Sequence, residues 1–112
     1  MHIRRDDSQF DECQIELLTA IIETISGELK KAKLDDDHLK ELVTNIAFHV
    51  CCAVDGSLVM EKGGKTISPV LTFAGESDDE VISCGGGSYM HEYVHGFVEE
   101  LLQPKPKTGF AT

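Results

Sequence analysis

Apolar residues recur at the three- and four-residue spacings of an amphipathic helix in two long stretches of the chain. The first stretch predicts a helix over about Asp11–Lys33, and the second predicts one from the aspartate run 35–37 to about Val54. The first apolar stripe is Leu18, Ile21, Ile22, Ile25 and Leu29. The second is Leu39, Leu42, Val43, Ile46, Val50 and Val54. The second half of the later helix is apolar on almost every side, which predicts a buried central helix.

The pattern changes to short apolar runs after Asp55-Gly56, which we expect to end the second helix. The runs Ser57–Glu61 and Thr66–Ala74 flank a Gly-Gly pair, and this arrangement predicts a β-hairpin. Pro69 has no amide hydrogen to donate, so it should lie at a sheet edge or a bulge. An acidic loop from Gly75 to Glu80 is expected to follow the hairpin.

The last part of the chain predicts one more strand and one more helix. Val81–Cys84 has the length and composition of a short strand. A glycine-rich link follows, and Ser88 is a suitable N-cap for a helix that runs to about Gln103. Pro104 stops this helix.

The element order is therefore α-α-β-β-(β)-α, an α+β fold with two N-terminal helices, a short antiparallel hairpin or sheet, and a C-terminal helix. A chain of 112 residues fits one small acidic domain. We expect residues 1–10 and 104–112 to be loose ends.

Charge narrows the classes of partner. The formal net charge is −10 and the pI is about 4.7, so the sequence argues against nucleic-acid binding and against anionic membrane surfaces. An acidic chain can instead bind a cationic protein, a polyamine or a metal ion. No signal peptide and no apolar stretch of about 20 residues is found, so we expect a cytoplasmic protein.

The four cysteines form no C-x-x-C pair, and we expect them to be reduced. Cys51 and Cys52 are adjacent on a predicted helix, where they suit buried packing better than a disulfide. His49 and Cys52 could act as a base and a nucleophile, although a histidine beside a buried thiol is more often structural.

The candidate chemistry lies in His91-Glu92-Tyr93-Val94-His95. On a helix, His91 and His95 project from one face, where both can reach one zinc ion, and Glu92 can act as general base on a zinc-bound water. The stretch resembles the motif of zincin metalloproteases, which implies a zinc-dependent metallohydrolase. The resemblance covers five residues and leaves the rest of the chain without a family.

Such an enzyme needs a third protein ligand, and the family's usual positions do not supply one. The metzincin extension would place Gly and His where Val98 and Leu101 stand. Glu99 lies about 12 Å along the helix from His91, too far to share one ion. The remaining candidates are upstream: His49, Cys52, Asp55 and Cys84. The sequence does not select among them.

Two further patterns have ordinary explanations. The stretch Cys84–Ser88 precedes a helix but matches no phosphate-binding motif, so we interpret it as a connector. The acidic runs 35–37 and 78–80 do not match a calcium loop and are expected to be solvated turns and caps.

The sequence favours a non-catalytic binding or regulatory module for a protein partner, and the acidic charge suits a basic one. A homodimer built on the apolar helices is possible. The alternative is a zinc-dependent hydrolase with His91 and His95 as ligands and Glu92 as catalytic base.

Overall fold

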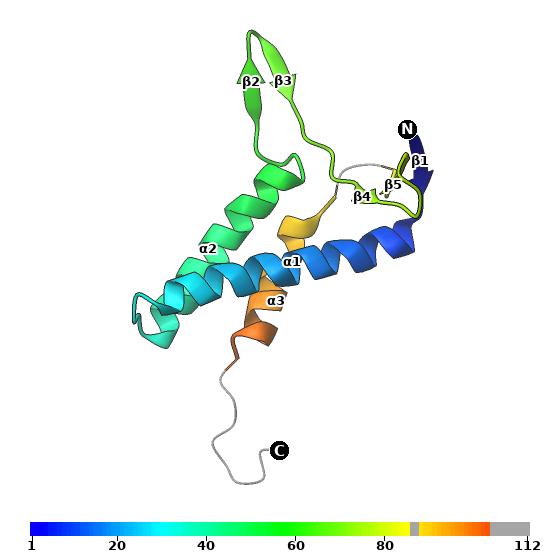
Figure 1. The fold of residues 1–112 in the computed structure, drawn as a ribbon. Helices are drawn as coiled ribbons and strands as arrows, with labels where there is room; N and C mark the ends of the chain where they lie inside the picture. The colour runs from blue at the N-terminus through cyan, green and yellow to red at the C-terminus, as the bar shows by residue number, and fades with distance from the viewer. Residues whose placement is uncertain (86–87, 104–112) are drawn as a thin grey trace.

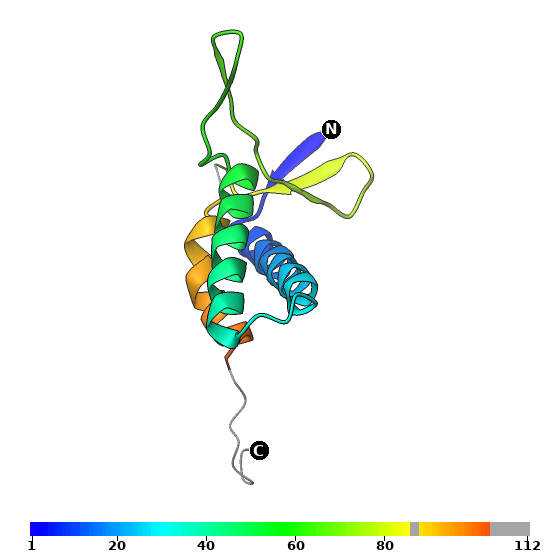
Figure 2. The ribbon, with the colours of Figure 1, turned by 90° about the vertical axis from the view of Figure 1, so that its left-hand side faces the viewer.

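The computed structural model describes residues 1–85 and 88–103. Three helices form its body: α1 (Asp7–Lys30), α2 (Asp36–Val54) and α3 (Val94–Leu101). A turn of 3-10 helix, η1 (Met90–Tyr93), leads directly into α3. Figures 1 and 2 show α1 crossing α2, while α3 packs alongside α2. The core between these helices consists of Leu18, Ile22, Leu39, Val43, Ala47, Cys51, Met90, Val94 and Val98.

Within the described residues, five short strands form two separate sheets. In the first, β5 (Glu80–Ser83) lies between β1 (His2–Arg5), which runs parallel to it, and β4 (Phe73–Ala74), which is antiparallel. In the second, β2 (Met60–Lys62) and β3 (Lys65–Ile67) form an antiparallel hairpin. This hairpin projects away from the helices as an isolated arm (Figures 1 and 2).

The α+β class is therefore confirmed, with two N-terminal helices, short strands and a C-terminal helix, although one strand, β1, precedes the first helix. No helix in the described part of the chain combines the length and the apolar character needed to cross a bilayer. The predicted loose tail, 104–112, lies outside the described residues.

The N-terminus differs from the expected loose lead-in. Residues 2–5 form β1, held in place where Arg4 donates hydrogen bonds to Glu80 (3.1 Å), Asp6 (3.0 Å) and Gln9 (3.0 Å). Helix α1 begins at Asp7 rather than Asp11, because the side chain of Asp6 caps it by accepting a hydrogen bond from the amide of Gln9.

The first helix also ends earlier than predicted, at Lys30 rather than Lys33. The aspartate run behaves as expected, since Asp35 caps α2 by accepting a hydrogen bond from the His38 amide. Asp55 is the C-cap of α2, and the following Gly56 has a φ of +84°. The predicted end of the second helix is thus confirmed.

The Gly63-Gly64 turn is confirmed, with φ values of +60° and +78°. The strand predicted over Thr66–Ala74 is wrong in its length: β3 ends at Ile67 and β4 begins at Phe73. Pro69 lies in the gap between them, where the missing amide hydrogen does not interrupt a ladder. The chain therefore leaves the β2–β3 hairpin arm here and enters the three-stranded β1-β5-β4 sheet.

The last helix is divided, because Met90–Tyr93 is 3-10 and only Val94–Leu101 is α-helical. Ser88 is not its cap: Tyr89 occupies that position and makes no side-chain capping hydrogen bond. Residues 86–87 of the predicted connector lie outside the described residues.

Helix α2 is not buried on all sides, which corrects the expectation of a central helix. Its buried ridge is Leu39, Val43, Ala47 and Cys51. The neighbouring ridge Leu42, Ile46 and Val50 is 38–39% exposed. The apolar pattern of α2 is wider than the single face that α1 and α3 cover.

Substitution by Ala should change the free energy of unfolding in opposite directions at two glycines. Gly27→Ala in α1 should raise the free energy of unfolding by about 1 kcal/mol, because an added Cβ meets open space and Ala favours the helix. Gly56→Ala should lower it by about 1–2 kcal/mol, because φ is +84° and the Cβ would lie 3.1 Å from the Pro69 carbonyl. Urea unfolding of both variants measures this; equal shifts would contradict the described turn at Gly56.

Candidate functional site

The carboxylate of Asp55 lies at the meeting point of three segments. Its side chain is fully buried at the end of α2. One oxygen accepts a hydrogen bond from the Ser57 amide at 3.1 Å, and the other accepts one from the His91 amide at 3.2 Å. The Nδ1 atom of His91 makes a short hydrogen bond to the same second oxygen. Asp55 thus joins the end of α2 to the start of η1.

These contacts decide the ionisation of Asp55. Burial by itself raises the pKa of the Asp55 carboxyl, but the hydrogen bonds from His91 and Ser57 outweigh burial, and the net pKa is below its ordinary value. Asp55 is therefore a carboxylate at neutral pH. A carboxylate facing Nδ1 keeps the proton on that nitrogen and leaves Nε2 as the acceptor of a neutral His91 ring.

Phe48 of α2 gathers three histidine rings. The centroids of His49, His91 and His95 lie 5.8, 5.9 and 5.9 Å from the Phe48 centroid, each in an edge-to-face arrangement. His91 and His95 therefore do face the same side, as their spacing predicts. Their common neighbour, however, is an aromatic ring.

The zinc hypothesis gains no third ligand from this arrangement. Within residues 1–85 and 88–103, no group of three His, Cys, Asp or Glu side chains is placed to hold a metal ion. Asp55 does reach His91, but as a hydrogen-bond partner, and Glu92 is exposed. A carboxylate partner on the far nitrogen is nevertheless typical of histidines that bind metals. The assignment of His91 and His95 as ligands remains a prediction.

The other upstream candidates have different surroundings. His49 is exposed, and its Nδ1 lies 2.7 Å from the carbonyl oxygen of Asn45. Burial raises the pKa of the Cys52 thiol, which keeps the thiol protonated and weakens it as a nucleophile. Cys84 follows β5 and lines a cavity on the N-terminal part of α1, together with Asp7 and Asp11.

A groove with an apolar floor runs along one side of α1. We use the name α1 groove for two adjoining hollows of about 690 and 280 Å³. The first hollow is lined by Glu12, Cys13, Glu16, Leu17 and Phe73. The second is lined by Ala20, Ile21, Thr24, Ile25 and Val50. Positions 13, 17, 20, 21, 24 and 25 follow helical spacing, so they form one continuous strip of α1.

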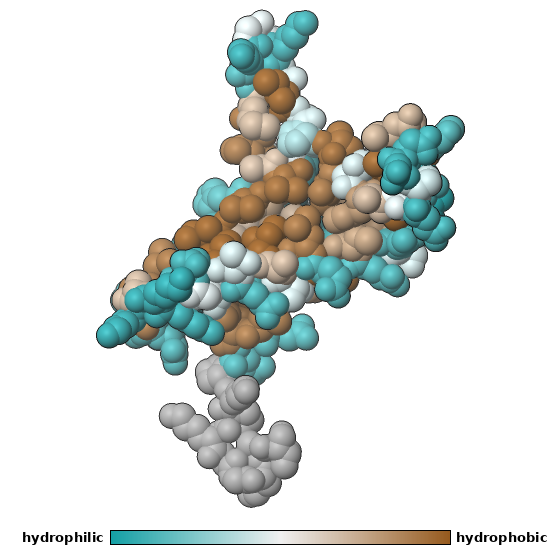
Figure 3. All heavy atoms as spheres, in the orientation of Figure 1, coloured by the Kyte–Doolittle hydropathy of each residue, from teal (hydrophilic) through white to brown (hydrophobic). Residues whose placement is uncertain are grey.

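The surface around the α1 groove is strongly apolar in a protein with a net charge of −10. Figure 3 shows a continuous hydrophobic area over α1 and the adjoining part of α2. The exposed ridge Leu42, Ile46 and Val50 borders it from α2. Two acidic residues, Glu12 and Glu16, line the end nearest the N-terminus. Contiguous apolar areas of this kind commonly mark interaction surfaces.

The sequence placed Ile21, Ile25 and Val50 in the apolar stripes of their helices, but it did not show that Val50 would stay exposed and that Ile21 and Ile25 would be only partly buried at the edge of the core. The width of the apolar pattern on α2 was the available signal, because one helix face cannot use so many apolar positions. Which positions stay uncovered depends on the packing of α1 and α3, which the pattern does not contain.

Comparisons with protein-family models, with curated proteins and with solved structures found no match.

Replacing the buried carboxylate gives a pH-dependent test. Asp55→Asn should lower the free energy of unfolding by about 2 kcal/mol at pH 7, because charge-assisted hydrogen bonds to His91 and Ser57 are weakened. The folded-state pKa of Asp55 is depressed, so its stabilisation is present above an unfolded pKa of about 3.9 and is lost as pH falls through the folded value. The difference in the free energy of unfolding between wild type and Asp55→Asn should therefore shrink below about pH 4.

Urea unfolding across this pH range measures the effect. Asp78→Asn is the matched control, because Asp78 is exposed in the acidic loop and should change stability by less than about 0.5 kcal/mol. A constant difference between Asp55→Asn and wild type down to pH 2 would contradict the role of the charge.

Metal content tests the zinc hypothesis directly. Two histidines without a third ligand bind zinc weakly, so purified tag-free protein should retain well below one zinc ion per chain. Elemental analysis of wild type and His95→Ala should give the same low value. Stoichiometric zinc that disappears in His95→Ala would instead establish the motif as a metal site.

Proposed function

We propose that this chain is a protein-binding module whose α1 groove takes an amphipathic helix with basic residues from a partner protein. The observation that supports this proposal is the partly exposed apolar strip on α1, bordered by exposed apolar residues of α2. The cytosolic location expected from the sequence belongs to the same proposal.

The dimensions of the α1 groove suit a helix. The strip from Cys13 to Ile25 covers twelve helical steps, or about 18 Å, which is a little over three turns. A partner helix of about 14 residues could lay apolar side chains at positions i, i+3, i+4 and i+7 along it. Such binding would bury the Ile21, Ile25 and Val50 side chains that line the hollow beside α2.

The charge of the molecule favours a basic partner over a second copy. Two chains of net charge −10 repel each other on approach, whereas a cationic helix is attracted and guided. Glu12 and Glu16 stand beside the apolar floor formed by Leu17 and Phe73. A lysine or arginine on the polar edge of the partner helix can pair with these carboxylates while its neighbours fill the floor.

The hydrolase alternative has weaker support. It needs a metal and a third ligand, and the described residues offer no such group. It also places Glu92, the catalytic base of that hypothesis, on an exposed part of η1. A binding module needs only surfaces that the described residues already present.

Model peptides test the proposed groove. A Leu-Lys peptide of about 14 residues with leucines at helical spacing should bind. The same peptide with Glu in place of Lys should have an affinity about tenfold lower. Val50→Asn and Glu16→Gln should each weaken the Leu-Lys peptide severalfold, through loss of apolar contact and of charge respectively. Fluorescence anisotropy at several salt concentrations measures these affinities.

The controls are the same substitutions placed outside the groove. Val59→Asn changes an exposed valine next to the hairpin arm, and Glu100→Gln changes an exposed acid on α3; both variants should bind the Leu-Lys peptide like wild type. Affinity that ignores salt, or equal losses in the controls, would refute the proposal. A dimer seen by sedimentation and abolished by Val50→Asn would assign the groove to a second copy.

A further inference from the structure

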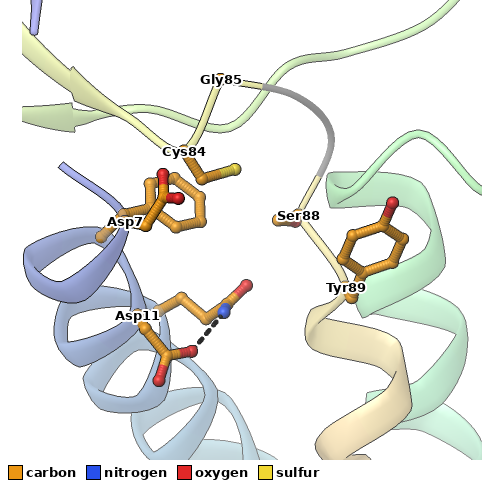
Figure 4. A pocket seen from close by; sticks show the side chains of 8 residues that line it. Asp7, Asp11, Cys84, Gly85, Ser88 and Tyr89 are labelled. Carbon is orange, nitrogen blue, oxygen red and sulfur yellow. Dashed lines mark hydrogen bonds between the residues drawn. The ribbon is translucent and has the colours of Figure 1, made fainter. Parts of the chain in front are cut away.

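The cavity that Cys84 lines lies at the N-terminal part of α1. It shares no lining residue with the α1 groove or with the histidines around Phe48. It has a volume of about 410 Å³, within the range of small-molecule sites. Its walls come from the first turns of α1 and from the chain on either side of residues 86–87. Figure 4 shows Asp11, on α1, on one side of this space and Ser88 and Tyr89 on the other.

Two buried polar side chains that line this cavity lack hydrogen-bond partners. Gln14 is 5% exposed and Ser88 is 4% exposed. Within the described residues, the Oε1 atom of Gln14 and the Oγ atom of Ser88 have no partner. Buried polar atoms in folded proteins are nearly always paired, so two unpaired oxygens at one cavity indicate a missing binding partner.

The orientation of the Gln14 amide is fixed by its neighbour. Its Nε2 atom donates a hydrogen bond to Oδ1 of Asp11 at 2.9 Å, drawn as the dashed line in Figure 4. A carboxylate only accepts, so the amide cannot be turned over without placing oxygen against oxygen. The unpaired atom is therefore an acceptor.

The cavity consequently offers acceptors and negative charge. The Asp11 carboxyl accepts hydrogen bonds from Gln14 Nε2 and from the Tyr93 hydroxyl, the latter at 3.2 Å. Asp7 lines the cavity too, but its carboxylate is paired with Arg5 at 3.2 Å. Phe10, 2% exposed, and Tyr89 supply aromatic surface. Such a site repels anions and favours a ligand that donates hydrogen bonds, carries positive charge and has an apolar body.

We propose that this cavity binds an alkylammonium group, with Gln14, Ser88 and Asp11 accepting hydrogen bonds from its three N–H donors. An ammonium has three donors and no acceptor, which matches this set of oxygens. A bare metal ion fits less well, because the cavity is far larger than an ion and the described residues hold no three-ligand group. The aromatic rings of Phe10 and Tyr89 would contact the carbon chain.

The probe for this site is n-butylammonium chloride, titrated at constant ionic strength and followed by NMR chemical shifts and calorimetry. 1-Butanol is its neutral counterpart and sodium butyrate its anionic one. Butylammonium should bind saturably, about tenfold more tightly than 1-butanol, and butyrate should not bind. The shifts should centre on Gln14 and Ser88.

Variants separate ligand recognition from folding. Gln14→Met and Ser88→Ala should each weaken butylammonium about tenfold. Ser88→Ala removes only an unpaired hydroxyl, so it should lower the melting temperature of the ligand-free protein by no more than about a degree. Gln14→Met also removes the hydrogen bond from Nε2 to Asp11, so its melting temperature should fall further. Ser26→Ala is the matched control: Ser26 is also buried with an unpaired hydroxyl on α1, but it lies outside this cavity. It should leave butylammonium affinity unchanged.

A further comparison identifies the source of the ammonium group. Nα-acetyl-lysine methylamide binding more tightly than butylammonium would assign the cavity to a lysine side chain of another protein, and the reverse order would assign it to a free amine. The proposal is overturned if butylammonium fails to bind, if 1-butanol binds equally well, or if Ser26→Ala weakens binding as much as Ser88→Ala.

Discussion

The carboxylate of Asp55 is the contact on which the arrangement of the chain depends. Asp55 is the C-cap of α2. Its carboxylate accepts hydrogen bonds from the Ser57 amide, on the segment that leads to the hairpin arm, and from His91 at the start of η1. A fully buried charge is tolerable only when donors surround it, and the three donors here come from two segments far apart in sequence. Satisfying this one group therefore sets where the last helix sits against α2.

The position of the last helix decides in turn which surfaces stay open. Helix α3 is short, Val94–Leu101, and with α1 it covers only the inner ridge of α2. The next ridge, Leu42, Ile46 and Val50, is left partly exposed beside the apolar strip of α1. The open apolar area thus follows from three helices of unequal length.

Local patterns in the sequence predicted the local structure well. The limits of α2, the cap at Asp35 and the Gly63-Gly64 turn all depend on residues within a few positions of each other. Strand β1 was missed because its partner is β5, with His2 opposite Glu80, and such pairing leaves no local trace. The strand forms only when residues 2–5 lie beside residues 80–83.

The candidate sites were predictable to different degrees. The spacing of His91 and His95 correctly placed both rings toward one neighbour, but the sequence could not show that Asp55 would bond to Nδ1 of His91. Gln14 offered a clearer hint, since it occupies the same helical ridge as the buried Phe10, Leu18 and Ile22. A polar side chain among core positions indicates that it needs a hydrogen-bond partner inside the protein.

The hairpin arm formed by β2 and β3 contributes no residue to the hydrophobic core. Its tip, Gly63-Gly64, is exposed and meets nothing within 4 Å of an added Cβ. Exposed tips that bear no packing are where chains tolerate interruption. A foreign peptide or a whole domain could therefore be inserted at this turn while α1, α2 and α3 keep their packing, which makes the arm a natural attachment point for a label.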